Sequence, residues 1–219
     1  MAYRPVILVT GFEPFLGSDR NPSVEAVMQL PDELLGCRIE RRELPVVWFD
    51  YINMLDRYMD ELRPRAVLGV GQGYPAPPIL IERIGMNICN GPDNSHEVDL
   101  RDEPLFFGGP AAYFTTTPYA AIHKRLKEEG IPVRYNFNAG QNQCNGLLYS
   151  TLHLAATKYQ GVRAGFIHVP MLPEQSTPER PVEGYPLEKT ARAIRLCVEE
   201  VCRAVTYSVR TLDQYREEM

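Results

Sequence analysis

The sequence predicts an α/β fold in which a mostly parallel central sheet is covered by helices on both faces. Short apolar, β-branched segments alternate with longer segments whose apolar residues recur at helical spacing, and this alternation is typical of parallel strands joined by crossover helices. A chain of 219 residues, 44% of them hydrophobic and 23% charged, is long enough to bury one substantial core. Because no repeat, low-complexity tract or linker divides the chain, we expect a single domain over residues 1–219.

Several segments are expected to form strands, because each is a short run rich in apolar and β-branched residues. They are residues 5–10, 37–47, 66–71, 79–87, 131–137 and 164–170. The second is longer and more polar than the others, as is typical of a strand near the edge of a sheet.

The segments expected to be helical are residues 21–30, 49–62, 118–130, 145–159 and 187–207. The first has Asn21 as a candidate N-cap and Pro22 at the first helical position. The stretches that lie between elements and contain Pro and Gly are expected to be long loops, at residues 73–78, 88–112 and 170–186. Loops of this length within a compact domain are often functional.

The charge and the cysteine content of the chain argue against several classes of protein. The 23 basic and 28 acidic residues give a net charge of −5 with no long run of either sign, which argues against a nucleic-acid surface. The apolar run near the N-terminus is too short for a signal sequence, and no segment approaches the length of a membrane span. The five cysteines are scattered and form no CxxC pair, so we expect neither a disulfide framework nor a metal site. These features predict a cytoplasmic protein that binds neither membranes nor nucleic acid.

Cys144 is the first candidate for chemistry. A free cysteine is most often a small packed apolar residue, so a catalytic role requires a histidine and an acid close to it. Ligands of an open parallel sheet bind at the carboxyl ends of its strands. His168 lies near the end of the last expected strand, Cys144 follows the preceding strand by a short turn and opens a helix, and Glu82 lies within an earlier strand.

These three side chains are the types that nucleophilic catalysis by a thiol needs. The thiolate is the attacking species, and a thiol with an ordinary pKa of about 8.5 is only slightly ionised at neutral pH. A helix N-terminus favours the anion, and an adjacent imidazolium pairs with the thiolate and later protonates the leaving amine. A carboxylate on the other ring nitrogen fixes the tautomer of the imidazole. Spacing alone leaves both interpretations open, a packed thiol and a nucleophile.

The other cysteines and histidines are weaker candidates. Cys89, in the loop after the Glu82 strand, could be reactive but carries no motif. Cys197 and Cys202, five residues apart on the last helix, are expected to pack. His153 is expected to be structural or surface-facing, and no histidine has metal-ligand spacing around it.

Five segments, in order along the chain, resemble one known family. They are VTGFEPFLGSDRNPS (9–23), LGVGQ (68–72), IERIGMN (81–87), NAGQNQCN (138–145) and AGFIHVPMLPEQ (164–175). Together they resemble pyroglutamyl peptidase I, a family of cysteine exopeptidases also called pyrrolidone-carboxylate peptidases, over about residues 5–200. The resemblance implies a three-layer α/β/α domain that needs no cofactor and no metal. It also implies that the chain removes N-terminal pyroglutamate from peptides.

The family's Glu-Cys-His triad maps onto Glu82, Cys144 and His168. The resemblance implies that Cys144 attacks the pyroglutamyl carbonyl to form an acyl-enzyme, that His168 serves as general base and acid, and that Glu82 orients the imidazole. Relatives are often homo-oligomers, and the sequence leaves the oligomeric state open.

A pocket for the lactam ring is also implied by the resemblance. Phe12 and Phe15 match its aromatic walls, and Asn21 and Gln72 match motif positions near it. Without the resemblance, the two phenylalanines could be core residues after a strand, Asn21 a helix cap and Gln72 a polar turn residue.

The chain departs from the family pattern next to the cysteine. Asn142 and Gln143 replace an aromatic and an aliphatic residue close to the acyl site. Because burying an unpaired amide costs about 1–3 kcal/mol, these side chains must find partners, face outward or enlarge the site. An arginine that commonly precedes the motif PDN (92–94) is missing, and Leu16 stands where the family commonly has Gly. The alternatives to a pyroglutamyl peptidase are therefore a family member with altered acyl specificity and a non-catalytic ligand-binding protein.

Overall fold

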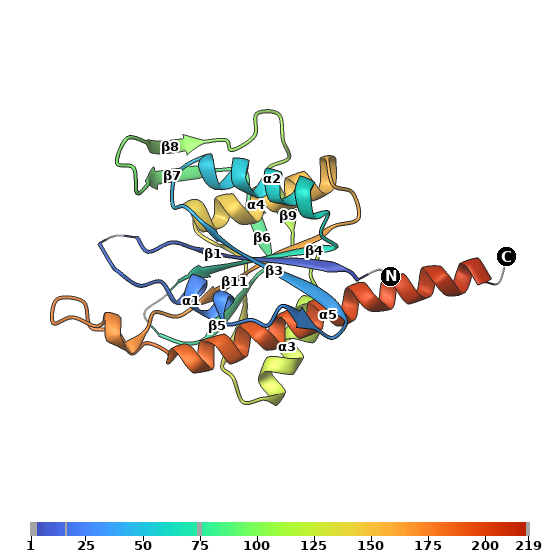
Figure 1. Cartoon of the computed structure of the whole chain (residues 1–219). Helices are drawn as coiled ribbons and strands as arrows, with labels where there is room; N and C mark the ends of the chain where they lie inside the picture. Colours follow the sequence, from blue (N-terminus) through green and yellow to red (C-terminus); the bar gives the residue numbers. More distant parts are fainter. Residues whose placement is uncertain (1–3, 16, 74–75, 218–219) are drawn as a thin grey trace.

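The computed structural model describes residues 4–15, 17–73 and 76–217, so the departure at Leu16 lies outside the described residues, as do Tyr74 and Pro75 (Figure 1). A twisted seven-stranded sheet forms the centre of the molecule, with the strand order β10-β5-β11-β4-β1-β3-β2. Its pairings are both parallel and antiparallel, and the predicted α/β fold with a mixed, mostly parallel sheet is confirmed.

Six of the strands of this sheet lie close to predicted segments, whereas the two-residue edge strand β2 was not predicted. The bounds of the strands are Val6–Phe12 (β1), Glu33–Leu34 (β2), Cys37–Leu44 (β3), Ala66–Gln72 (β4), Ile79–Glu82 (β5), Val133–Asn136 (β10) and Arg163–Val169 (β11). β1 pairs in parallel with β3 and β4, β4 with β11, and β5 with β10. β5 and β11 are antiparallel, so β5 and β10 run against the direction of the central strands.

Helices cover both faces of the sheet and produce three layers (Figure 1). One face carries α1 (Pro22–Met28), α3 (Tyr119–Glu128) and α5 (Leu187–Glu217). The other carries α2 (Asp50–Leu62) and α4 (Gln143–Thr157). Buried apolar side chains of these helices meet the sheet in one cluster on each face, and the central strands β1 and β4 are buried almost throughout. Such burial explains why these strands are continuous apolar runs.

The chain between β5 and α3 differs from the expectation. Residues 79–87, predicted as one strand, are divided, because β5 ends at Glu82 and β6 (Ile84–Met86) pairs with β9 (Ala112–Phe114) outside the main sheet. The predicted loop 88–112 contains the hairpin of β7 (Cys89–Pro92) and β8 (Asp99–Glu103). This hairpin is polar and largely exposed, so its sequence has no apolar alternation from which strands could be predicted.

The last helix is longer than predicted. α5 continues to Glu217 instead of ending near residue 207, and its C-terminal part extends past the edge of the sheet (Figure 1). Residues 208–217 contain neither Gly nor Pro, so nothing in the local sequence ends the helix.

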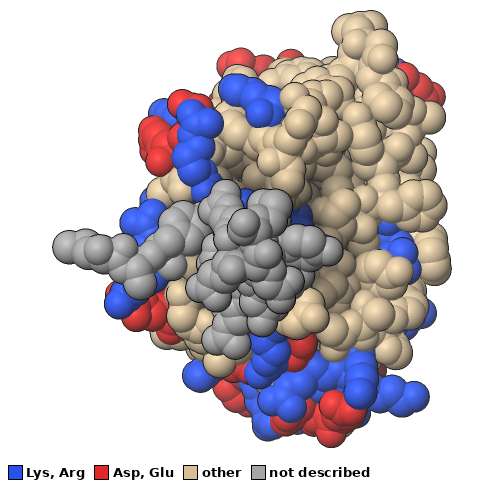
Figure 2. All heavy atoms as spheres, turned by 90° about the vertical axis from the view of Figure 1, so that its right-hand side faces the viewer, with Lys and Arg blue, Asp and Glu red and all other residues tan. Residues whose placement is uncertain are grey.

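Charged side chains of both signs are intermingled on the surface. On the face drawn in Figure 2, Lys and Arg lie beside Asp and Glu. Ion pairs such as those of Arg203 with Glu199 and Glu200 link neighbouring turns of α5. Within the described ranges, no helix combines the length and the apolar composition that a membrane crossing requires.

The side chain of Asn145 connects the start of α4 by hydrogen bonds to the chain that follows β5. Its fully buried side chain accepts a hydrogen bond from Met86 N at 2.9 Å and donates to Met86 O and Ile88 O, each at 2.9 Å. The first turn of α4 is therefore held in place by three backbone contacts of one amide.

We expect Asn145→Ala to lower the free energy of unfolding by about 3 kcal/mol, because these bonds are lost and buried backbone groups are left unpaired. Thr157→Ala is the matched control on the same helix. Thr157 is exposed and donates only to His153 O at 2.7 Å, so its loss should cost less than about 0.5 kcal/mol. Urea unfolding of both variants measures the difference, and equal losses would contradict this role of Asn145.

Candidate active site

Cys144 is the second residue of α4. The helix begins at Gln143 after the cap residue Asn142, and the bond from Gly146 N to Asn142 O, at 3.0 Å, is the one that closes its first turn. The N–H groups of residues 143–145 consequently have no partner within the helix. Cys144 is half-buried, so its thiol lies at a helix N-terminus, where a negative charge is stabilised.

Strand register brings His168 and Glu82 together. In the antiparallel pair of β5 and β11, Glu82 lies opposite Phe166 and His168 lies opposite Leu80. His168 and Glu82 are thus diagonal neighbours on one face of the sheet, a spacing that long side chains can bridge. His168 Nδ1 lies 2.7 Å from Glu82 Oε1. β5 and β10 run against β11, so Glu82, at the end of β5, does not lie at the carboxyl edge of β11. It is within reach of His168 because the register places the two residues one diagonal step apart.

Glu82 and His168 are both buried, and a further side chain holds the carboxylate. The Glu82 side chain is fully buried, and Asn136 Nδ2 donates to both of its oxygens at 3.0 Å. Burial by itself would lower the pKa of His168, but the charge of Cys144, the hydrogen bonds to Cys144 and Glu82, and the charge of Glu82 outweigh it. The pKa of His168 is raised from 6.5 to about 10. His168 can therefore hold a proton at neutral pH between Cys144 and the carboxylate of Glu82.

Gly71 near the end of β4 and Gly73 just after it leave the space that the thiol and the imidazole occupy. A Cβ added at Gly71 would lie 2.9 Å from Cys144 Sγ and 2.7 Å from Phe166 Cζ. Gly71 of β4 pairs with His168 of β11, so a side chain at position 71 would lie beside the imidazole. A Cβ at Gly73 would lie 3.1 Å from His168 Cβ. Sulfur and imidazole can approach each other here because these two residues have no side chains.

A cavity of about 520 Å³ opens at Cys144 and His168. The predicted site residues that line it are Phe12, Phe15, Asn21, Gln72, Asn142, Gln143, Cys144 and His168. Glu82 lies behind the imidazole and does not line the cavity. Asn21 also caps α1, because its Oδ1 accepts from Ser23 N at 3.0 Å, so the cap and pocket interpretations of this residue are compatible.

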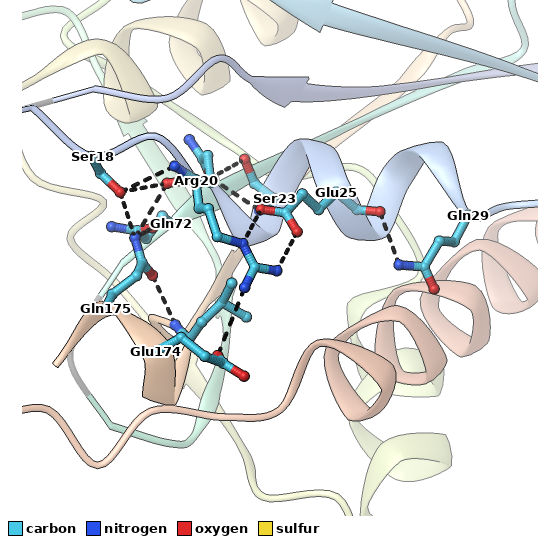
Figure 3. A network of polar contacts seen from close by, with 10 residues as sticks. Ser18, Arg20, Ser23, Glu25, Gln29, Gln72, Glu174 and Gln175 are labelled. Carbon is cyan, nitrogen blue, oxygen red and sulfur yellow. Dashed lines mark hydrogen bonds and ion pairs between the residues drawn. The ribbon is translucent and has the colours of Figure 1, made fainter.

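Gln175 fixes the orientation of Gln72, as Figure 3 shows. Gln175 Oε1 accepts from Leu172 N at 2.8 Å, and its Nε2 donates to Arg20 O at 3.2 Å, so the two ends of its amide are assigned by backbone partners. The same Nε2 donates to Gln72 Oε1 at 3.0 Å. Gln72 is therefore held with its NH₂ end pointing away from Gln175, and no acceptor for this Nε2 is found among the described residues. No role was expected for Gln175, although it closes the segment AGFIHVPMLPEQ.

Of the two polar residues that depart from the family pattern before Cys144, one has a partner in the protein and the other faces outward. Gln143 is buried and its Nε2 donates to Pro92 O at 3.0 Å, whereas Asn142 is exposed at the cavity. The segment before Pro92, which lacks the family's arginine, is bound to the turn before α4 through Asn90. Asn90 N donates to Gln141 O at 2.9 Å, and Asn90 Nδ2 donates to Gln141 Oε1 at 2.8 Å. Polar contacts from the turn before α4 thus hold the β7–β8 hairpin.

Three other cysteines, Cys89, Cys197 and Cys202, are packed in the interior. Cys89 is fully buried, its Sγ lies 3.1 Å from Glu103 O, and burial raises its pKa to about 11, which contradicts the suggestion that it is reactive. Cys197 and Cys202 are fully buried in the packing of α5, as expected. His153 packs against Phe106 with ring centroids 4.3 Å apart. His96, for which no role was expected, lines the cavity.

A thiol at a helix N-terminus, beside a buried histidine–carboxylate pair on an α/β scaffold, defines the class as that of the cysteine hydrolases. A family model described as pyroglutamyl peptidase matches residues 6–204. The pyrrolidone-carboxylate peptidase of Thermococcus onnurineus is 39% identical over 200 residues, covering 90% of this chain and 99% of the relative. That of Chromobacterium violaceum is 41% identical over 196 residues, covering 88% of this chain and 90% of the relative.

Solved structures share the fold over nearly the whole chain. Pyroglutamyl peptidase I of Bacillus amyloliquefaciens superposes with a TM-score of 0.86 at 31% identity, covering 91% of this chain and 98% of that one. A mutant pyrrolidone carboxyl peptidase of Pyrococcus furiosus gives a TM-score of 0.87 at 33% identity, covering 91% and 99%. The chain belongs to the pyroglutamyl peptidase family, and it is an enzyme of the cysteine peptidase class.

The role of the β4 glycines can be tested by filling their space. We expect Gly71→Ala to slow alkylation of Cys144 by iodoacetamide by about tenfold or more, because the added methyl group displaces the sulfur from the imidazole. Gly69→Ala is the matched control. Its Cβ would meet the same Phe166 ring, at 2.6 Å from Cδ2, without contacting Cys144. Both variants should lose about 1–3 kcal/mol of stability by overpacking, but only Gly71→Ala should lose thiol reactivity. An equal loss of reactivity in both would contradict the specific role of Gly71.

Proposed function

We propose that this chain hydrolyses the bond that follows an N-terminal pyroglutamyl residue of a peptide, with Cys144 as the nucleophile. The observation that carries the proposal is the buried 2.7 Å contact of His168 Nδ1 with Glu82 Oε1 beside the thiol. Because the carboxylate engages Nδ1, the other ring nitrogen is left for the sulfur. Membership of the family supplies the substrate class.

In the first half of the reaction, Cys144 Sγ attacks the pyroglutamyl carbonyl carbon as a thiolate. The oxygen of that carbonyl gains negative charge and accepts hydrogen bonds from free N–H groups in the first turn of α4. His168 then gives its proton to the leaving nitrogen, and the C–N bond breaks. The shortened peptide leaves with a new amine, and the pyroglutamyl group remains on Cys144 as a thioester.

Forming the thioester changes the protonation of His168. The charge of Cys144 is among the causes that raise the pKa of His168, and it disappears when the sulfur is acylated. The pKa of His168 therefore falls, and the neutral imidazole can take a proton from the attacking water. Water adds to the carbonyl, the C–S bond breaks, and pyroglutamate leaves as the thiolate–imidazolium pair re-forms.

The lactam ring would bind between the aromatic side chains of the cavity. Phe12 and Phe15 supply apolar surface, and an uncharged ring needs few polar contacts besides this. Gln72, held by Gln175, offers its Nε2 as a donor to the lactam carbonyl. This arrangement favours a ring amide over an acyl group that lacks a carbonyl in the ring.

Release of a fluorescent amine from a pyroglutamyl amide tests the proposal, with a prolyl amide as the substrate that lacks the ring carbonyl. We expect turnover of the pyroglutamyl substrate alone, and a loss of at least about 10³-fold in Cys144→Ala. Failure of the folded wild-type protein to turn over the pyroglutamyl amide would overturn the proposal. It would favour the alternatives of another acyl group or of a binding protein, both raised by Asn142 and Gln143.

The role of Glu82 predicts a shift in pH dependence. In Glu82→Gln the carboxylate no longer supports the imidazolium, so the pKa of His168 falls and the proton is lost at lower pH. The alkaline limb of the kcat/KM profile should move to lower pH by about one unit or more, with kcat reduced about 10²-fold. Glu61→Gln, the same change at an exposed residue of α2, is the control. An unchanged alkaline limb in Glu82→Gln would exclude this role.

A further inference from the structure

We infer that Gln143 is a specificity-determining residue, whose Oε1 accepts a hydrogen bond from the ring N–H of the acyl group. The inference rests on the proposed function, since it names the acceptor that distinguishes a lactam from other rings of the same shape. The resemblance to the family gives no such role to this position, where an aliphatic residue is usual.

The orientation of the Gln143 amide is fixed by the backbone. Its Nε2 lies 3.0 Å from Pro92 O, and a carbonyl oxygen can only accept, so the group that faces it must be the NH₂ end. The carbonyl end of the amide is therefore the one directed away from Pro92.

The Oε1 of Gln143 is an acceptor with no partner in the protein. Among the described residues, no hydrogen bond to this oxygen is formed, although the side chain is 7% exposed. Gln143 lines the cavity and directly precedes Cys144. Gln143 Oε1 is not among the fully buried polar atoms that lack a partner, so this acceptor stays open to the cavity, where a donor of the bound acyl group would satisfy it.

The polar groups of the cavity match the two polar groups of a lactam. A pyroglutamyl ring presents one C=O acceptor and one N–H donor, on adjacent atoms. Gln72 is held as a donor by Gln175, and Gln143 is held as an acceptor by Pro92. In both residues a hydrogen bond within the protein fixes which end of the amide is left for a ligand, so the pair is set for a ring of this kind before substrate binds.

The test compares two substrates with the same leaving amine. One is the pyroglutamyl amide, and the other is the 3-oxocyclopentanecarbonyl amide, in which CH₂ replaces the ring N–H and the ring carbonyl is kept. The ratio of their kcat/KM values isolates the N–H, because structural damage to the enzyme lowers both values together. We expect Gln143→Met, which keeps the length of the side chain, to lower this ratio by about tenfold or more.

Gln29→Met is the matched control. Gln29 lies on the exposed surface after α1, where its Nε2 donates to Glu25 O at 3.2 Å, and its substitution should change neither the ratio nor the rate. A ratio in Gln143→Met equal to that of the wild type would overturn the inference while leaving the proposed function intact. Absence of pyroglutamyl turnover by the wild type would instead overturn the proposed function, and the inference with it.

A second measurement needs no turnover by the variant. The ring alone can be offered as 2-pyrrolidone or as cyclopentanone, and protection of Cys144 from iodoacetamide reports its binding. The wild type should be protected at lower concentrations of 2-pyrrolidone than of cyclopentanone, and Gln143→Met should lose this preference. Retention of the preference in Gln143→Met would contradict the inference even if that variant hydrolyses neither substrate.

Discussion

The hydrogen bond between His168 Nδ1 and Glu82 Oε1 joins β11 to β5. It also pairs two ionisable groups that would each lose their charge if they were buried alone. An isolated carboxylate without exposure to water is costly to keep charged, and so is a buried imidazolium. Each group supplies the other's counter-charge at 2.7 Å, and Asn136 occupies both carboxylate oxygens from the far side. The proton on His168, and through it the state of the Cys144 sulfur, depends on this contact being kept dry and fixed in direction.

The surrounding structure serves to hold that contact beside the thiol. The antiparallel pairing of β5 with β11 supplies the diagonal offset between Glu82 and His168, and Gly71 leaves room for the sulfur over the neighbouring strand. Asn145 ties the first turn of α4 to the chain after β5. Because these restraints come from different parts of the chain, the geometry of the site is determined by the whole sheet and not by a local motif.

The need to pair buried polar groups also explains the polar residues next to Cys144. Gln143 in the protein interior is tolerated because Pro92 O accepts from its Nε2, and the turn before α4 makes further contacts with Asn90. Gln143 is thus paired with the protein at one end of its amide, and we infer that the other end recognises the substrate. The polar pair that distinguishes this chain from its family is thereby consistent with a peptidase of this class.

Much of the fold could be predicted from the sequence, because the central strands are apolar runs and the helices have periodic apolar faces. Asn21 as the cap of α1 and the start of α4 near Cys144 are examples. The exposed β7–β8 hairpin could not, since its residues follow no apolar pattern. The residues Glu82, Cys144 and His168 were identified through short motifs, whereas Asn136, Gly71 and Gln175 were missed. Their contribution depends on register and tertiary contact, which spacing along one chain does not contain. The direction of β5 was missed for the same reason.

Titration of the His168 imidazole by NMR, in protein labelled at histidine, tests the central claim most directly. The account predicts that His168 remains protonated well above neutral pH in the wild-type protein, consistent with its pKa of about 10, and that the pKa falls in Cys144→Ala because the charge on sulfur is gone. An ordinary pKa of about 6.5 for His168 in both proteins would contradict the account. It would mean that the buried pair with Glu82 does not maintain an imidazolium beside the thiol.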